Sequence, residues 1–474
     1  MGNPQLPHMT LSFDDIPLEL LPIIFDSVVR AQHLAFLCLV NKSFYEFAIQ
    51  RLYRRVYIYA WHTNAKSKVV LLFQTLSSCP RLAHYLSRLE IRAFPKALPS
   101  SSYNDLLGLC TRGIRNCVNL TSCAWTRDGS LQSDILLALQ QCPKLKELEI
   151  NGKDSGYYDP NILTRFSKLS RISLIMPSAQ VIEVLPSWIS ITGPTLRNLT
   201  MICQTSSLIT DTLLESLAPS MTDLDHLSII GCPKVTHRGI GEIVSTNRNG
   251  LVGIGLERLS PAFDMTSFNR ICKDCHAFRR LRSITLAVHN ETPFQTWTDD
   301  VTDLLSTAPL QILQIYATTP TAKVVIPDDF WETIVTMHGS RLKRFSIDRM
   351  TISLGALQDI CSRCSVLEQL FVVTTRHNLD EVTRCFAAAH NLRAIHVNFY
   401  REANDTDERS MMNDALRIVR QCPTTVTQIG CDTRVWHVRR EVRMNDKAEL
   451  YTVPTLTSYE NPDIPEQFLV ARGA

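Results

Sequence analysis

Two pairs of cysteines have the spacing of metal ligands. Cys272 and Cys275 are separated by two residues and are followed by His276, and Cys361 and Cys364 have the same spacing. Two C-x-x-C pairs offer four thiolates, a ligand set that holds a structural zinc ion. Zinc binding is therefore the first hypothesis, and it requires the chain to bring the two pairs together.

The surrounding sequence argues against that site. Cys364 lies three residues before Leu367, as Cys142 lies three residues before Leu145, so this cysteine occupies a position in a repeat. Cys361 falls on the apolar stripe of a predicted helix. The two pairs are several repeats apart, too far along a repeat array to share one ion. We interpret these cysteines as small buried apolar residues and predict no metal site.

The sequence contains no other pattern that is typical of catalysis. Gly250, Gly253 and Gly255 lie within a predicted strand, whereas a dinucleotide-binding turn joins a strand to a helix. His226 and His396 have no paired nucleophile. We therefore predict a non-catalytic protein with no cofactor, and a hydrolase built from scattered histidines and cysteines is an alternative without a motif behind it.

A hexamer of the form L-x-x-L-x-I recurs through most of the chain. Its copies start at Leu86, Leu120, Leu145, Leu169, Leu196, Leu224, Leu251, Leu281, Leu310, Leu342, Leu367, Leu392 and, more weakly, Val426. The mean spacing of about 28 residues lies in the range of leucine-rich repeats. The hexamers predict short strands, and apolar residues at helical spacing lie between them. Ser133, Asp211 and Asp380 are the predicted N-caps of three of these helices.

One copy carries a longer signature: Gly231, Cys232, Val235, Thr236, Gly239 and Ile240 occur in that order. This stretch resembles the cysteine-containing subclass of leucine-rich repeats. The resemblance implies an α/β horseshoe of about 12–13 repeats, with parallel strands on the concave side and helices outside.

The predicted register assigns a set of side chains to the concave face. Early copies place charged residues there, including Arg88, Glu90 and Arg92, and later copies place more apolar ones. The predicted protein-binding residues are Ile230, Ile312, Tyr316, Arg344, Phe371, Val373 and His396. The alternative is a register that slips by one residue, which would turn these side chains into the core.

A separate helical module precedes the repeats. Pro17 suits a first helical turn, and Leu20, Ile24 and Val28 recur at four-residue steps. A second helix is predicted over residues 33–40, and Asn41 would cap a third. Three short helices bury little, so we expect exposed apolar side chains and a partner that covers them.

These residues resemble an F-box, through Ile16-Pro17-Leu18-Glu19-Leu20-Leu21, Ile24-Phe25, Leu37-Cys38-Leu39-Val40-Asn41-Lys42-Ser43-Phe44 and the stretch from Leu52 to Ile58. The resemblance implies binding to the Skp-type adaptor that links substrate receptors to a cullin. Carried over by motif position, the adaptor-facing residues are Ile16, Pro17, Leu20, Leu21, Ile24, Phe25, Leu39 and Val40. The competing interpretation is that some of them form the internal core of the bundle.

The predicted organisation is a flexible N-terminus (1–13), the F-box (14–58), a helical linker (59–85), the repeats (86–432), and a C-terminal cap and tail (433–474). The composition is that of a globular protein, with 45% hydrophobic residues and a net charge of +3. We therefore predict neither nucleic acid nor a membrane as the main partner. Fifteen cysteines without a secretory signal indicate reduced thiols in the cytoplasm or nucleus.

Two hypotheses of function follow from these expectations. The first is the substrate-recognition subunit of an SCF ubiquitin ligase, whose F-box binds the adaptor and whose concave face binds a protein substrate. The second is a leucine-rich-repeat scaffold or inhibitor that does not direct degradation. The sequence identifies neither the substrate nor any modification or small molecule required for its recognition, and it leaves open whether the C-terminal tail covers the concave face.

Overall fold

The computed structural model describes residues 17–28, 30–95, 100–204, 206–289, 294–318, 326–399, 408–444 and 449–459. The chain divides into two compact units, and the boundary lies between Leu148 and Glu149. Each unit is described by itself. Ile16, the predicted N-terminus 1–13 and the last fifteen residues of the predicted tail lie outside the described residues.

The first unit begins with helices and continues with three parallel strands in chain order. Its helices are η2 (Leu18–Leu20), α1 (Leu21–Asp26), α2 (Ala31–Leu37), α3 (Lys42–Arg54), α4 (Ala65–Ser78), α5 (Pro80–Ala83), α6 (Ser100–Asn116) and α7 (Ser133–Gln140). Its strands are β1 (Arg55–Ile58), β2 (Arg88–Ile91) and β3 (Ser122–Trp125).

The second unit alternates strands with helices, beginning with β4 at the boundary. Its strands are β4 (Glu147–Asn151), β5 (Arg171–Ile175), β6 (Asn198–Ile202), β7 (His226–Ile230), β8 (Gly253–Glu257), β9 (Ser283–Val288), β10 (Ile312–Ala317), β11 (Arg344–Asp348), β12 (Gln369–Thr374), β13 (Ala394–Phe399), β14 (Gln428–Cys431), β15 (Arg434–Met444) and β16 (Leu450–Ser458). Its helices are η3 (Pro160–Arg165), α8 (Ala179–Thr192), α9 (Asp211–Leu217), η4 (Ala218–Ser220), α10 (His237–Thr246), α11 (Met265–Asp274), α12 (Phe294–Leu305), α13 (Asp328–His338), α14 (Leu354–Arg363), η5 (Arg376–Asn378), α15 (Leu379–Phe386) and α16 (Glu408–Gln421).

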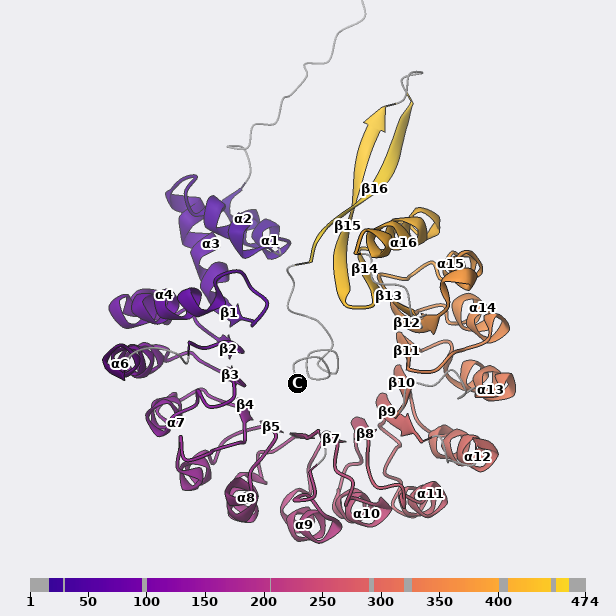
Figure 1. The fold of residues 1–474 in the computed structure, drawn as a ribbon, viewed down its shortest axis with the longest axis horizontal. Coiled ribbons are helices and arrows are strands. Elements are labelled where there is room, and N and C mark those ends of the chain that lie inside the picture. Colours follow the sequence, from indigo (N-terminus) through magenta and orange to yellow (C-terminus); the bar gives the residue numbers. More distant parts are fainter. Residues whose placement is uncertain are drawn as a thin grey trace, which may run out of the picture. The chain divides into compact units, whose positions relative to one another are not determined.

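Neighbouring strands from β5 to β14 pair in parallel and in chain order within the second unit, with the helices α8 to α16 along the other side of the strand row (Figure 1). This is the arrangement that the leucine-rich-repeat pattern predicts. Each predicted hexamer from Leu86 to Val426 is followed, two residues after its start, by a strand. The predicted period and register are therefore confirmed.

The repeat leucines form the core between the strands and the helices. In the copy that contains β7, Leu224, Leu227 and Ile229 are fully buried, and His226 and Ser228 alternate with them on the other strand face. The same alternation in each copy stacks apolar side chains from one repeat onto the next. Burial of these side chains supplies the main stabilisation of the unit.

The turn after β7 explains the glycine in the predicted signature. Gly231 has a φ of 70°, and a Cβ atom there would lie 2.0 Å from the carbonyl oxygen of Cys203 in the preceding repeat. Only glycine satisfies both the left-handed backbone and this close approach. Cys232, next in the chain, is fully buried.

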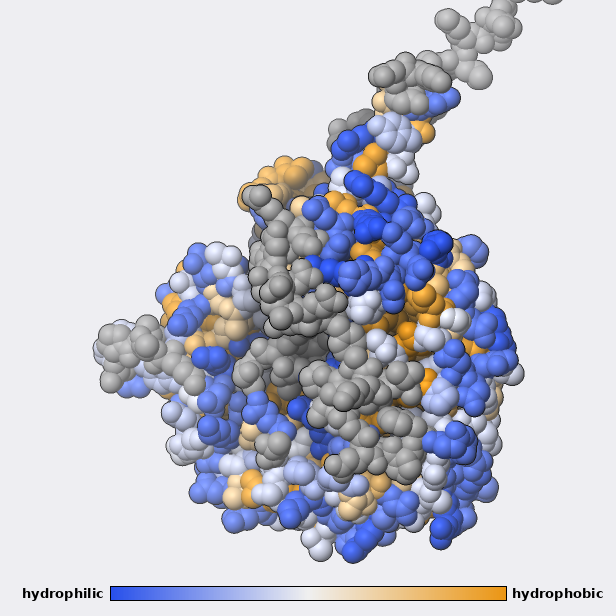
Figure 2. Space-filling view, turned by 45° about the vertical axis from the view of Figure 1, so that its right-hand side comes forward, coloured by the Kyte–Doolittle hydropathy of each residue, from blue (hydrophilic) through white to orange (hydrophobic). Residues whose placement is uncertain are grey.

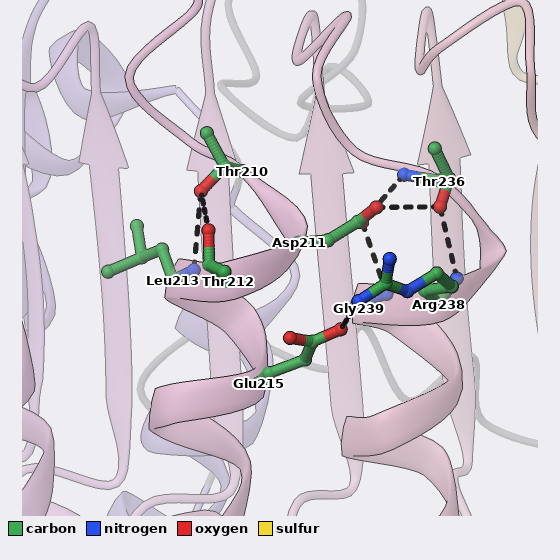
Figure 3. A network of polar contacts seen from close by, with 8 residues as sticks. All are labelled: Thr210, Asp211, Thr212, Leu213, Glu215, Thr236, Arg238 and Gly239. Atoms are coloured by element: carbon green, nitrogen blue, oxygen red, sulfur yellow. Dashed lines mark hydrogen bonds and ion pairs between the residues drawn. The ribbon is translucent and has the colours of Figure 1, made fainter.

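The start of α10 is capped from two repeats (Figure 3). Thr236 is its N-cap and accepts a hydrogen bond from the Arg238 N–H at 3.2 Å. Asp211 accepts hydrogen bonds from the Thr236 N–H at 2.8 Å, the Thr236 hydroxyl at 2.7 Å and the Gly239 N–H at 3.1 Å. The aspartate that begins α9 thus ties the next helix to it.

The predicted N-caps need correction. The N-cap of α9 is Thr210, whose hydroxyl accepts from the Leu213 N–H, and Asp211 is already inside the helix. Ser133 and Asp380 also lie inside the first turns of α7 and α15. A side chain in the first turn can reach the neighbouring repeat, as Asp211 does. Its hydrogen-bond partner therefore depends on how the repeats stack, which the local sequence does not determine.

An antiparallel hairpin of β15 and β16 follows the last parallel strand, β14. The pairing of β15 with β14 covers the edge that the open strand row would otherwise expose. Beyond that pairing the hairpin projects from the unit, and apolar side chains reach its surface (Figure 2). They include Val442, Met444 and Leu450.

Candidate functional site

The first helices separate into a buried side and an exposed side. Leu21, Phe25, Leu34, Phe44 and Ala48 form the core of the bundle. The Phe25 and Phe44 rings meet edge to face, with centroids 5.2 Å apart. The predicted cap is confirmed, because the Asn41 side chain accepts a hydrogen bond from the Phe44 N–H at 2.9 Å. The bundle therefore has an apolar core of its own.

Large apolar side chains remain on the exposed side of this bundle. We call the following set the N-terminal apolar surface: Leu18, Leu20, Ile23, Ile24, Phe36, Leu39 and Val40. Leu39 is 83% exposed and Ile23 is 67% exposed. By contrast, no residue of the bundle core is more than 8% exposed. Exposed apolar side chains gathered in one short segment are a feature that is typical of binding surfaces.

The predicted adaptor-facing residues divide between the two sides. Pro17, Leu20, Ile24, Leu39 and Val40 are exposed. Leu21 and Phe25 are each only 2% exposed, so their side chains support the surface from inside instead of forming it. Leu18, Ile23 and Phe36 belong to the surface and were absent from the prediction. In the sequence only their apolar character indicates such a role, because they lie outside the predicted apolar stripe of the helix.

The strand face of the second unit contains the other predicted residues. Ile230, Ile312, Tyr316 and Arg344 are half-buried, and the core residues Leu313 and Ile315 alternate with them. Ile312 pairs with Arg344 in the sheet register. The predicted side of the strand is thus correct for these four residues.

The remaining members, Phe371, Val373 and His396, lie on the same face but offer little open surface, with exposed fractions between 5% and 7%. Phe371 and His396 are register partners, and their rings stack with centroids 5.9 Å apart. Large side chains in one lateral row cover each other, which a pattern along the chain does not reveal.

Polar side chains continue this face across neighbouring strands. The Asn398 amide donates to the Asp348 carboxylate at 2.9 Å, and the Asn398 oxygen lies 3.1 Å from the His396 Nε2. Burial raises the pKa of Glu257, and burial also raises the pKa of Tyr316, with the nearby Glu257 as the second cause. For both groups burial therefore disfavours the charged form.

The strand face of the first unit holds a different polar cluster. Glu90 is buried on β2, where it accepts hydrogen bonds from the Arg55 Nε–H at 2.8 Å and from the Tyr59 hydroxyl at 3.0 Å. Arg92 lies 4.0 Å from the same carboxylate. The Tyr59 ring stacks on Trp61, with centroids 4.5 Å apart and an angle of 4° between the rings. Sequence reasoning found Glu90 and Arg92 but missed Tyr59 and Trp61, because no motif marks them.

The cysteine pairs are built for packing. Cys272, Cys361 and Cys364 are buried, and the thiol of Cys275 donates to the Ile271 carbonyl at 3.0 Å. Burial raises the pKa of Cys364 to about 12, so its thiol stays protonated at neutral pH. Among the described residues no group of three or more histidine, cysteine or acidic side chains could hold a metal ion.

A cavity of about 230 Å³ lies where β8 and β9 lead into α11 and α12. Its wall includes Phe263 and Trp297 together with Asp264 and Asp300. Both carboxylates have structural partners: Asp264 caps α11, and Asp300 accepts from the Thr266 hydroxyl at 2.6 Å. In the described part of the chain, no helix combines the length and the apolar character needed to span a membrane.

Comparisons with known proteins add one structural similarity. No family model matches the sequence, and no curated protein matches it. The solved structures that match include the leucine-rich repeat-containing protein LegL7 from Legionella pneumophila, with 10% identity, a TM-score of 0.35, and coverage of 64% of this chain and 90% of that one. The assignment of the fold rests on the strand pairing and the buried repeat leucines, which define a leucine-rich-repeat type of α/β architecture.

Proposed function

We propose that this chain is the substrate-recognition subunit of an SCF-type ubiquitin ligase. In this proposal the helices at the N-terminus are an F-box that binds a Skp-type adaptor, and the adaptor links the chain to a cullin. The repeats hold a protein target, and other subunits transfer ubiquitin. The observation that carries the proposal is the N-terminal apolar surface.

That surface is costly for a protein to leave in water. Burying one large aliphatic side chain is worth about 1.5–3 kcal/mol, so several together can hold a partner. The bundle core is already filled by Leu21, Phe25 and Phe44, so the exposed residues have no space inside it. A partner with an apolar groove therefore completes the burial better than any rearrangement within the bundle.

The strand faces supply the second half of the proposal. Parallel strands present rows of side chains that differ from repeat to repeat, as Ile312 and Arg344 do in one row. Such faces bind proteins rather than carry out chemistry. A target held there beside a transferring enzyme reacts faster because its effective concentration is raised.

Adaptor binding is the direct experiment. The variant Ile24→Asp with Leu39→Asp places two charges in the N-terminal apolar surface and leaves the bundle core untouched. We expect it to lose capture of a purified Skp-type adaptor, and thermal unfolding checks that the variant is still folded at the temperature of the capture experiment. Leu71→Asp is the matched control, because Leu71 is 61% exposed on α4, outside the surface. Equal adaptor capture by all three proteins would rule out the F-box proposal.

A non-degradative scaffold or inhibitor is the second candidate, favoured by the same repeat architecture. The two candidates differ in what happens to a captured protein. For a ubiquitin-ligase receptor, captured proteins become longer-lived when the chain is depleted or carries Ile24→Asp with Leu39→Asp. For a scaffold, their half-lives are unchanged.

A further inference from the structure

The cavity where β8 and β9 lead into α11 and α12 combines apolar side chains with aromatic rings. Its volume is about 230 Å³, and Leu256, Leu259 and Leu286 line it together with Phe263 and Trp297. That volume exceeds the ~150 Å³ that holds benzene in a protein core and is below the ~300–1,000 Å³ of sites for drug-sized ligands. The cavity therefore suits one small chemical group instead of a large molecule.

Both aromatic rings of the wall pack against other rings. The Phe263 ring meets the Phe268 ring with centroids 5.4 Å apart, and the His237 ring lies 6.2 Å from it on the same measure. Trp297 is 5% exposed, and its ring centroid lies 6.1 Å from that of Phe330. Because these contacts restrict both rings, the aromatic part of the wall is in place before a ligand binds, which lowers the entropy cost of binding.

The two carboxylates of the wall meet at one threonine. Asp264, the N-cap of α11, accepts a hydrogen bond from the Thr266 N–H at 3.1 Å. Asp300, on α12, accepts from the Thr266 hydroxyl at 2.6 Å. All three residues line the cavity, so both acidic groups belong to the same part of its wall. Hydrogen bonds, first among them the one from the Ser267 side chain, lower the pKa of Asp264, so this carboxylate is ionised at neutral pH.

The charge of the wall favours a cation. No lysine or arginine is among the described residues that line the cavity. His289 is the remaining titratable residue of that lining, and its Nδ1 lies 3.4 Å from the Thr318 hydroxyl. The π face of an aromatic ring attracts positive charge, as a carboxylate does. The rings and the carboxylates therefore select the same kind of ligand.

The apolar part of the wall selects among cations. Leu256, Leu259 and Leu286 offer no hydrogen-bond acceptor. A primary ammonium group would bring N–H donors against these side chains, and a buried donor without an acceptor costs free energy. A quaternary ammonium group carries its charge without N–H donors, and its methyl groups pack on rings and aliphatic side chains. A methylated cation therefore fits this wall better than a primary amine.

We propose that this cavity binds a trimethylammonium group. The positive charge lies beside Asp264 and Asp300, and the methyl groups pack on Phe263 and Trp297. Such a group occurs on small molecules such as choline and on trimethylated lysine side chains, so the experiment includes both sources. The inference goes beyond the proposed function and does not require the adaptor.

The first experiment is isothermal titration calorimetry of the full-length chain with choline. Its uncharged carbon analogue, 3,3-dimethylbutan-1-ol, tests the charge, and ethanolamine, a primary ammonium compound, tests the methyl groups. The titrations are made at about pH 8, where histidine side chains are ordinarily neutral. We expect choline to bind about tenfold more tightly than either control, as a desolvated cation–π contact predicts. Equal affinity for choline and either control would overturn the proposal.

A second pair of probes identifies the source of the group. A peptide that contains trimethyl-lysine is compared with the same peptide containing unmodified lysine. Tighter binding of the trimethylated peptide than of choline would assign the cavity to a protein ligand, and the reverse would assign it to a free small molecule. Either result supports the proposal. Absence of binding by both choline and the trimethylated peptide in the millimolar range would overturn it.

Variants test whether the ligand lies in the cavity. Asp300→Asn removes one negative charge, keeps an oxygen for the Thr266 hydroxyl, and should weaken choline binding about tenfold. Asp299→Asn is the matched control on the same helix, because Asp299 is exposed and is not among the lining residues. Phe263→Leu keeps an apolar side chain without a ring, so it should weaken choline and leave the affinity for 3,3-dimethylbutan-1-ol unchanged. Unchanged choline affinity in both Asp300→Asn and Phe263→Leu would contradict the proposed site.

The adaptor experiment separates this inference from the proposed function. Asp300→Asn should capture the Skp-type adaptor as well as the unmodified chain does, and Ile24→Asp with Leu39→Asp should bind choline normally. Choline binding without any adaptor capture would overturn only the ligase proposal. Adaptor capture by a chain that binds neither choline nor the trimethylated peptide would overturn only the cavity proposal.

Discussion

Asp211 and Gly239 fit together across two neighbouring repeats. The Asp211 carboxylate accepts a hydrogen bond from the Gly239 N–H at 3.1 Å, and a Cβ atom on residue 239 would lie 2.7 Å from that carboxylate oxygen and 2.9 Å from the Asp211 Cα. Because residue 239 has no side chain, the Asp211 carboxylate can approach its N–H closely and cap the helix of the next repeat.

Gly239→Ala should destabilise the second unit, although alanine normally favours a helix over glycine by about 1 kcal/mol. The added methyl group must displace backbone atoms of α9, at a cost of about 1–3 kcal/mol. Denaturant unfolding of the variant measures the change. Gly355→Ala, near the start of α14, is the control: its Cβ would meet nothing closer than 3.8 Å, so it should stabilise. Stabilisation by both substitutions would contradict this account.

Asp211→Ala should lower stability by about 1–2 kcal/mol, the usual cost of a lost helix cap. Because Asp211 and Gly239 share one contact, the double variant should be less destabilised than the two single changes added together. A double-mutant cycle measures that coupling, and strict additivity would show that the two residues act independently.

Truncating a buried side chain of the N-terminal bundle should lower its stability far more than truncating an exposed one. Phe25→Ala removes a buried ring that packs on Phe44 and should cost about 3–5 kcal/mol in bundle stability. Leu39→Ala, at an exposed position, should stay within about 0.5 kcal/mol of the unmodified chain. Hydrogen exchange of amides in α1 to α3 reports the difference, and equal protection in both variants would contradict the assigned core.

His338 should make the second unit sensitive to mild acid. It is fully buried on α13, and neither ring nitrogen has a hydrogen-bond partner among the described residues. Burial, with a smaller contribution from Arg341, lowers its pKa to about 4 from the ordinary 6.5. The folded state therefore favours the neutral ring, and this contribution to stability is complete above pH 6.5 and lost progressively as the pH falls towards 4.

Replacing His338 by leucine removes both the titration and the unpaired polar atoms. We expect the variant to be more stable at pH 7 by about 1 kcal/mol, and its advantage to grow as the pH falls from 6.5 to 4. Thermal unfolding across that range measures the difference between the two proteins. A difference that stays constant with pH would mean that His338 titrates normally in the folded chain.

Thiol reactivity should single out one cysteine. Cys79 is exposed, Cys38 and Cys275 are partly exposed, and the other twelve are buried. In the native chain a thiol reagent should react first with Cys79, and Cys79→Ser should abolish that fast phase, because buried thiols react only after opening. Rapid labelling of Cys361 or Cys364 would contradict the packing role given to those pairs.

Local patterns were enough to predict the elements and their register. The hexamer leucines determine which side of each strand is buried, since the side chains of a strand alternate strictly. The structure has Leu227 and Ile229 in the core and Ile230 on the strand face, as the pattern predicts. Asn41 likewise caps α3, because its partner, the Phe44 N–H, is three residues away.

Contacts between distant residues were decided only by the tertiary structure. Tyr59 and Glu90 are 31 residues apart in sequence, so no local pattern predicts that they hold Trp61 in place. Leu21 and Ile24 are both apolar residues of α1, and only the packing of α2 and α3 determines that the first is buried and the second exposed. Periodicity along the chain is a property of one element, whereas burial and capping depend on which neighbours an element meets.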